Sequence, residues 1–127
     1  MSENNYTVTG INQLAQQIYT DNKAKGFWDK ERNVGEMLML VTSELGEAME
    51  AHRKGKFANW SAFNTNQQTD FKTNFEANIK DSFEDEIADA IIRLLDMVGG
   101  LNIDIEKQLT TKLYYNTTRG KLHGKTY

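Results

Sequence analysis

Two pairs of acidic residues, each with the spacing i, i+3, are the best candidates in this sequence for holding a metal ion. Glu44 and Glu47 form the first pair, and Glu86 and Asp89 form the second. On a helix this spacing places both members of a pair on one face. Carboxylates that gather away from water are costly to bury and repel one another, and a hard cation such as Mg²⁺ or Mn²⁺ relieves both costs. Two neighbouring helices could therefore place four carboxylates around one ion.

The residues around these acids indicate whether the carboxylates are buried or exposed to solvent. Leu40 and Ala51 bracket the first pair along the series i, i+4, i+7, i+11, whereas Glu50 falls on another face. The second pair borders the apolar row of its own helix. An alternative is that both pairs line a wet surface and that Asp89 and Arg93 form an ordinary i, i+4 ion pair. The two pairs alone leave both interpretations open.

A row that turns from apolar to cationic occurs near the end of the chain. Ile105 and Leu109 begin the row, and Lys112, Asn116 and Arg119 continue it at helical spacing. A buried cation needs a partner, so the partner is either an acid of another helix or an anionic ligand. Neutralisation of a helix C-terminus is the alternative role for the two cations. A phosphate ligand would suit both the acid pairs and this basic row, because a Mg²⁺ ion held by the acids and the basic side chains would together balance its negative charge.

Other catalytic chemistries lack the residues they require. The chain has no cysteine, and its two histidines, His52 and His123, occur in no Glu-x-x-His motif of the kind a di-iron bundle uses. The phosphate-binding motif G-x-x-x-x-G-K-[ST] is also absent. The remaining chemistry is attack on phosphorus by water activated by a metal.

Length and composition indicate one domain over residues 1–127 and argue against some partners. The net charge of −3 disfavours a duplex nucleic-acid binder. The polar N-terminus does not resemble a signal peptide, and no apolar run approaches the roughly 20 residues of a membrane span. We therefore expect a soluble cytoplasmic protein with no membrane partner.

Four amphipathic helices are expected to position these residues in an all-α fold of the four-helix-bundle type, in a chain that has no proline. Asn33, Ser82 and Asn102 are the expected N-caps of the last three. On the third helix, the apolar row is expected to face the core. The expected helices cover residues 10–25, 34–53, 82–98 and 102–119. The expected apolar rows of the second and third helices are Leu38, Val41, Leu45, Met49, His52, and Phe83, Ile87, Ile91, Leu94, Val98.

The segment 54–80 is too long for an ordinary connection. It is rich in Asn, Thr and Gln and carries five aromatic residues, which suggests that it packs on something. A lid, a short helical hairpin and a partly mobile excursion are all compatible with this composition. A lid over a nucleobase is our working interpretation. The aromatic residues are Phe57, Trp60, Phe63, Phe71 and Phe75.

Three segments together resemble the MazG-like all-α nucleoside triphosphate pyrophosphohydrolases, which include the dimeric dUTPases and the dCTP pyrophosphatases. "KGFWDKERNVGEMLMLVTSELGEAMEA" is similar to the family's first metal helix with its leading segment. "EDEIADAIIRLLDM" is similar to the second metal helix, and "KLYYNTTR" to the segment that closes the site. The resemblance covers roughly residues 10–120, and the order of the motifs makes it more specific than any one of them.

The resemblance implies Mg²⁺-dependent hydrolysis of a (d)NTP to the monophosphate and pyrophosphate. The two acid pairs would bind the metal, and Glu47, with Glu44, would serve the attacking water. Trp28 stands where relatives place an aromatic residue against the base, with Asn33 beside it, although packing over the second helix is an equal explanation for Trp28. A homodimer or homotetramer is implied. The residues that would contact the phosphates are Lys112, Asn116 and Arg119.

Two departures from the family pattern leave the substrate open. Many relatives carry a further glutamate where this chain has Ser43, and the segment 54–80 matches no part of the pattern. A different class of function also stays open, namely a non-catalytic oligomeric helical bundle that binds nucleotide or a protein partner.

Overall fold

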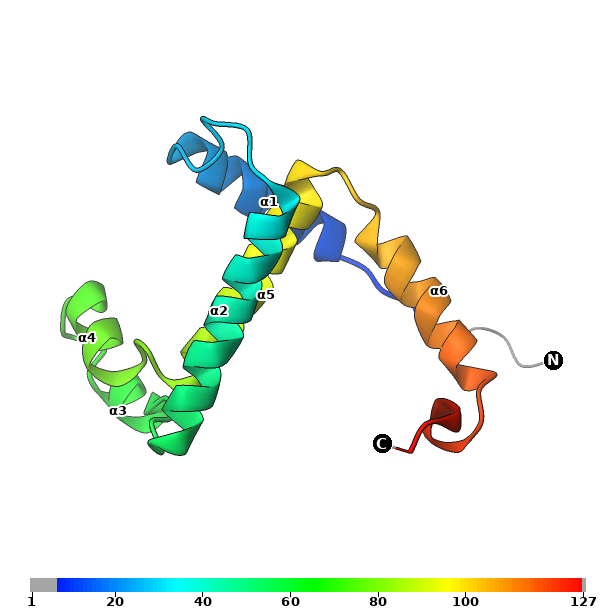
Figure 1. Cartoon of the computed structure of the whole chain (residues 1–127). Coiled ribbons are helices and arrows are strands. Elements are labelled where there is room, and N and C mark those ends of the chain that lie inside the picture. Colours follow the sequence, from blue (N-terminus) through cyan, green and yellow to red (C-terminus); the bar gives the residue numbers. More distant parts are fainter. Residues whose placement is uncertain (1–6, 127) are drawn as a thin grey trace. The chain divides into compact units, whose positions relative to one another are not determined.

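The chain is all-α, as the sequence predicts, and its computed structural model describes residues 7–126 (Figure 1). Six α-helices and one short 3-10 helix occur in these residues, with no strand among them. The helices are α1 (Ile11–Ala24), α2 (Val34–Arg53), α3 (Trp60–Thr65), α4 (Phe71–Asn78), α5 (Phe83–Gly100), α6 (Ile105–Thr117) and η1 (Lys121–Gly124).

The helices fall into two compact units. One contains residues 28–94, and the other combines residues 1–27 with 95–127, so that α5 contributes to both. The four predicted helices are all present, and α3 and α4 lie inside the segment 54–80. The sequence predicts a single domain over residues 1–127. That prediction requires the two units to associate into one domain, and it stays a prediction.

Side-chain caps set the start of most helices where the sequence predicts them. The Asn33 side chain accepts a hydrogen bond from Glu36 N at 3.1 Å, and Ser82 Oγ accepts one from Asp85 N at 3.2 Å. The predicted cap of the last helix is wrong. Asn102 adopts a left-handed conformation (φ 56°), and Asp104 caps α6 by accepting from Lys107 N at 3.1 Å. Residues 101–104 form the turn between the end of α5 and the start of α6, so Asn102 lies within the turn and Asp104 stands directly before α6.

The unit with both chain ends has a small apolar core around α1. Ala15, Leu95 and Val98 are buried together, and partly buried isoleucines of α1 and α6 pack against them. α1 and α5 approach closely at Gly99, because an added Cβ there would lie 2.5 Å from the carbonyl oxygen of Ala15. Asn12 joins α1 to the start of α6, accepting hydrogen bonds from the backbone N–H groups of Ile105 and Glu106.

In the unit of residues 28–94, the buried face of α2 differs from the predicted apolar row. Val41 is buried as expected, whereas Leu45 and Met49 are 50% and 56% exposed, and Glu44 is only 8% exposed. On α5 the predicted core face is wrong at Ile91 (51% exposed) and Leu94 (40% exposed). The predicted row of α2 is also wrong at Leu38 and His52, which are exposed. The buried side of α2 carries Met37, Val41, Glu44, Ala48 and Ala51. The interior side of α2 therefore combines Val41 of the predicted apolar row with Glu44 and Ala51 of the acid-bearing stripe. Leu40 and Glu47 of that stripe are exposed, so the prediction that the whole stripe is bordered by a dry interior is wrong at these two positions.

The segment 54–80 forms a helical hairpin, one of the three conformations compatible with its composition. α3 and α4 contact each other, and the amide of Asn74 (3% exposed) joins them by donating to the carbonyls of Phe63 (2.9 Å) and Asn66 (3.2 Å). Asn78 donates in turn to the Asn74 side-chain oxygen at 2.7 Å. The many asparagines of this segment thus form its polar interior and its helix caps.

Candidate metal centre

Three of the four predicted metal ligands come together between α2 and α5. Glu44, Glu86 and Asp89 each offer a carboxylate oxygen, and these oxygens all lie within 4.8 Å of one another. Glu44 comes from the middle of α2, and the other two come from consecutive turns near the start of α5. The i, i+3 spacing places Glu86 and Asp89 on one face of α5, and that face is turned toward Glu44 of α2.

Glu86 lies where a carboxylate is hard to keep without a partner. Its side chain is 4% exposed, and its Oε2 atom is buried without a hydrogen-bond partner. A buried carboxylate oxygen in this state is destabilising unless a proton or a cation joins it. The oxygen-only donor set of the three acids fits a hard divalent cation such as Mg²⁺ or Mn²⁺.

Arg93 is the charge partner of the site within the chain. Its Nε donates to Glu44 Oε1 at 2.8 Å, across the interface of α2 and α5. Among the described residues, Arg93 therefore forms its ion pair with Glu44 of α2, rather than the i, i+4 pair with Asp89 that its position on α5 also allows. Sequence analysis missed this role because Arg93 also lies four residues after an acid, which favours a local pair.

The environment pushes the pKa values of the two buried glutamates in opposite directions. Burial, together with hydrogen bonds and charges from Glu47 and Glu44, raises the pKa of Glu86 to about 8. Burial also acts to raise the pKa of Glu44, but the hydrogen bond from Arg93 and those shared with Glu47 and Glu86 hold it below its usual value. Burial and the charges of Asp85 and Glu44 raise the pKa of Asp89. One buried proton among these acids is the expected metal-free state near neutral pH.

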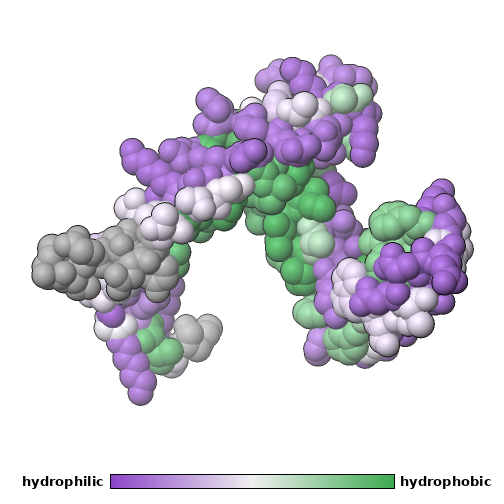
Figure 2. All heavy atoms as spheres, turned by 180° about the vertical axis from the view of Figure 1, so that it is seen from behind, coloured by the Kyte–Doolittle hydropathy of each residue, from purple (hydrophilic) through white to green (hydrophobic). Residues whose placement is uncertain are grey.

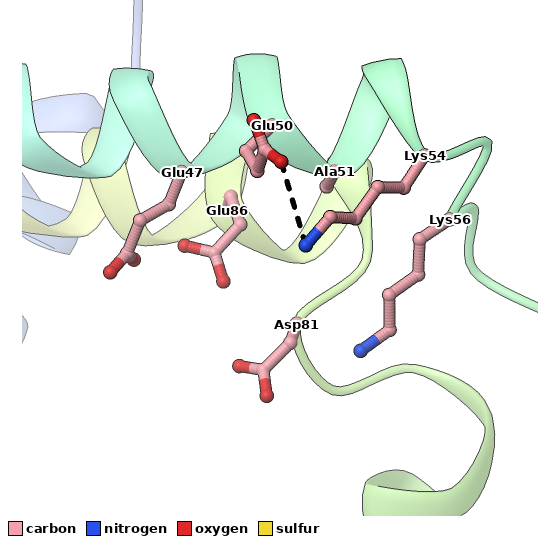
Figure 3. Close-up of a pocket in the computed structure, with 7 residues that line it drawn as sticks. All are labelled: Glu47, Glu50, Ala51, Lys54, Lys56, Asp81 and Glu86. Atoms are coloured by element: carbon pink, nitrogen blue, oxygen red, sulfur yellow. Dashed lines mark ion pairs between the residues drawn. The ribbon is translucent and has the colours of Figure 1, made fainter.

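Glu47, the fourth predicted ligand, lies at the edge of the site. It is exposed and does not belong to the close group of three, yet it is near enough to Glu86 to raise the pKa of that residue. Both side chains line one pocket of about 340 Å³ (Figure 3). Glu47 is thus a solvent-accessible carboxylate beside a buried acid group. This position suits a residue that orients a water molecule and accepts its proton, more than it suits a permanent metal ligand.

The same pocket has acidic and basic sides that sequence reasoning did not single out. Asp81 and Asp85 form a second close group of acids with Glu86. Figure 3 shows Lys54 and Lys56 on the opposite side, with Lys54 Nζ 3.5 Å from Glu50 Oε1.

The two predicted base-contacting residues precede α2, with Trp28 in the connection after α1 and Asn33 at the N-cap of α2. Trp28 is half-buried, and the guanidinium of Arg32 lies 4.9 Å from the centre of its ring. Asn33 is exposed, and its side chain serves as the cap of α2. The helix cap is the role that the structure gives to Asn33, and a contact with a base stays a prediction.

The three predicted phosphate-contacting residues belong to the other unit, on or just after α6. The Lys112 ammonium and the Arg119 guanidinium lie 5.0 and 5.5 Å from the ring centre of Tyr115. Asn116 Oδ1 is buried without a hydrogen-bond partner, and Arg119 also donates to the His123 carbonyl at 3.1 Å. Lys112 and Arg119 thus gather around one ring, but Lys112 is exposed, so the predicted core-facing row is not buried at that position. The role of the three residues toward phosphate stays a prediction.

Comparisons with protein-family models, with curated proteins and with solved structures gave no match for this chain. No helix within residues 7–126 combines the length and hydropathy that a membrane crossing requires. The functional interpretation therefore depends on the acid group and on the motifs of the sequence.

Proposed function

We propose that this chain is a Mg²⁺-dependent nucleoside triphosphate pyrophosphohydrolase with a MazG-like fold, acting in the cytoplasm on a (d)NTP. The observation that supports it best is the group formed by Glu44, Glu86 and Asp89, in which a buried carboxylate oxygen lacks a partner. The spacing of these acids on α2 and α5, and the later Lys…Asn…Arg segment, agree with the resemblance found in the sequence.

Each residue of the site has a proposed role in the hydrolysis. Glu44, Glu86 and Asp89 bind the cation, and Arg93 holds the carboxylate of Glu44 in place. Glu47 orients the attacking water and accepts its proton. A Mg²⁺ held by these acids would neutralise charge on the phosphate oxygens and make the attacking water more acidic. Water attacks the α-phosphorus, the bond to the bridging oxygen breaks, and pyrophosphate leaves.

Lys112, Asn116 and Arg119 are proposed to contact the phosphates. The position of Lys112 and Arg119 around the Tyr115 ring, and the unpaired buried oxygen of Asn116, support this role. For Trp28 and Asn33, a role near the base is supported by the sequence resemblance alone.

The test is a panel of ribo- and deoxyribonucleoside triphosphates with Mg²⁺ or Mn²⁺, with pyrophosphate and monophosphate as the measured products. Glu47→Gln and Asp89→Asn should each lower kcat/KM by at least a hundredfold, a typical loss when a group that assists proton transfer or holds the metal is removed. Glu50→Gln is the matched control, because Glu50 is on the same helix but pairs with Arg53 and Lys54 at the surface. Activity that survives both site substitutions would falsify the metal assignment.

Self-association is the second part of this proposal, in the form of a homodimer or homotetramer. Large apolar side chains on α2 and α5 are exposed in the single chain, and Figure 2 shows hydrophobic surface along these long helices. Exposed apolar patches on this scale mark interaction surfaces. Sedimentation of the wild type and of Leu45→Glu measures the oligomeric state and so tests self-association. A wild type that is monomeric at all concentrations contradicts this part of the proposal. The alternative of a non-catalytic oligomeric module predicts the same association without release of pyrophosphate.

A further inference from the structure

The helical hairpin of α3 and α4 holds a series of aromatic rings in fixed positions. Trp60, Phe63, Phe71 and Phe75 follow one another at centroid distances of 5.4, 6.2 and 5.9 Å. The buried amide of Asn74 fixes the two helices that carry them. These rings do not form an ordinary core, because Phe71 is 70% exposed.

A pocket of about 440 Å³ lies beside this series, between the hairpin and the start of α5. Phe71 and Phe75, with an interplanar angle of 29°, line it from α4. Ala88 and Ile92 line it from α5, and Asp89 of the candidate metal centre lines it as well. Its volume falls in the range of small-molecule pockets, roughly 300–1,000 Å³.

The pocket combines the three features that a nucleotide needs. Exposed aromatic faces accept a planar ring by stacking, which is tolerant of base identity. Lys72 and Glu76 line the same pocket and provide a hydrogen-bond donor and an acceptor for the edge of a ring. Asp89 connects this pocket to the acid group, where phosphates and a cation would meet.

We propose that this pocket binds the nucleobase of the nucleotide, with its ring against Phe71 and Phe75. This inference rests on the proposed function for the identity of the ligand. It assigns to the hairpin the recognition of the base, which the sequence resemblance assigns to Trp28. The segment without a counterpart in the family pattern is then the specificity element of this chain.

The experiment uses the full chain labelled with fluorophenylalanine, which gives one ¹⁹F signal for each of its 6 phenylalanines. Phe71→Leu and Phe75→Leu each remove one signal and so assign the two rings. The ligand probes are the common ribo- and deoxyribonucleosides in EDTA, then the α,β-methylene triphosphate analogue of the tightest binder with Mg²⁺. Tripolyphosphate with Mg²⁺ is the matched ligand without a base.

The expected result is a shift of the Phe71 and Phe75 signals with a nucleoside and with the analogue, but not with tripolyphosphate. Phe71→Leu and Phe75→Leu should each weaken binding of the analogue by about tenfold, from the loss of stacking. Phe57→Leu is the control, because Phe57 contacts the rings of His52 and Phe83 and does not line the pocket. Ala88→Phe, which fills the pocket without removing a ring, should abolish the shifts.

The two proposals fail separately in this experiment. Nucleoside binding at Phe71 and Phe75 without any hydrolysis of triphosphates supports the base pocket and contradicts the enzymatic function. Hydrolysis with unshifted Phe71 and Phe75 signals, and with analogue affinity lost only in Trp28→Ala, overturns the base pocket. Absence of a shift at both rings with every probe also overturns it.

Discussion

Titration of Glu86 should make the metal-free protein less stable as the pH rises from 5 to 9. The pKa of this carboxyl is raised from its ordinary value of 4.5 to about 8 in the folded protein, mainly by burial. Between these two values the folded state holds a proton that the unfolded chain has lost. Linkage then requires the free energy of unfolding to fall as the pH increases.

The size of this effect follows from the two pKa values. One pKa unit corresponds to about 1.4 kcal/mol, so the full interval from 4.5 to about 8 corresponds to about 5 kcal/mol. The part that falls between pH 5 and pH 9 is about 4 kcal/mol. The lowered pKa of Glu44 has the opposite sign, but its contribution is lost only as the pH falls below its unfolded value of 4.5, outside this interval.

Glu86→Gln isolates this effect, because glutamine has the shape of the protonated acid and no charge at any of these pH values. In EDTA the variant should be more stable than the wild type by about 5 kcal/mol at pH 9 and by about 1 kcal/mol at pH 5. Urea denaturation followed by circular dichroism measures this without adding salt, which would screen the charges. Mg²⁺ should stabilise the wild type and leave the variant unchanged, because ligand binding raises stability by mass action.

Glu50→Gln is the control for removal of a glutamate charge from the same region, since the Glu50 side chain is 53% exposed and paired at the surface. Its stability should follow that of the wild type at every pH. Equal stability of the wild type and Glu86→Gln at pH 9 would refute the reasoning, and so would a wild type with no change between pH 5 and pH 9.

Two other substitutions test packing and pairing. Gly99→Ala should lower the free energy of unfolding by about 1–3 kcal/mol, because its Cβ would meet the Ala15 carbonyl at 2.5 Å. Gly46→Ala, which has no neighbour within 4 Å, should instead raise it by up to about 1 kcal/mol in the same urea measurement, so equal effects contradict the close contact. Arg93→Gln removes the hydrogen bond to Glu44 and should cost about 1–2 kcal/mol, since the arginine side chain is 39% exposed and partly screened. A pH titration followed by NMR should then show a higher pKa for Glu44, and an unchanged pKa refutes the pairing.

Local signals predicted the helices and their starts, while burial depended on contacts that no local pattern contains. Asn33 and Ser82 cap α2 and α5 because their short polar side chains reach backbone N–H groups within one turn. Asn102 has the same chemistry and still fails as a cap, because its left-handed backbone conformation places it in the turn after α5. The choice between Asn102 and Asp104 depends on where α5 ends, which is set by tertiary contacts.

The candidate site shows the same division. Helical periodicity correctly set Glu44 apart from Glu50, but it also grouped Glu47 with Glu44, and Glu47 is exposed. The acid pairs indicated which two helices meet. Periodicity did not predict that an apolar residue beside the acids, such as Leu45, would be more exposed than Glu44. Periodicity identifies a stripe, but it does not say whether a stripe is covered by the same chain, by a second copy or by water.

Backbone hydrogen bonds at the base of the hairpin have a consequence for how the protein can change. The N–H of Phe83 donates to the carbonyl of Lys56 at 2.8 Å, and the N–H of Asn59 donates to the carbonyl of Asn78 at 2.9 Å. The point where the chain leaves α2 and the point where it enters α5 are therefore neighbours. Loop-closure entropy changes slowly with length, so a segment anchored in this way can be shortened, lengthened or exchanged at little expense to the helices on either side. We therefore expect that the hairpin can be exchanged for another segment between α2 and α5. Such an exchange would change the residues that line the pocket and leave the acid group in place.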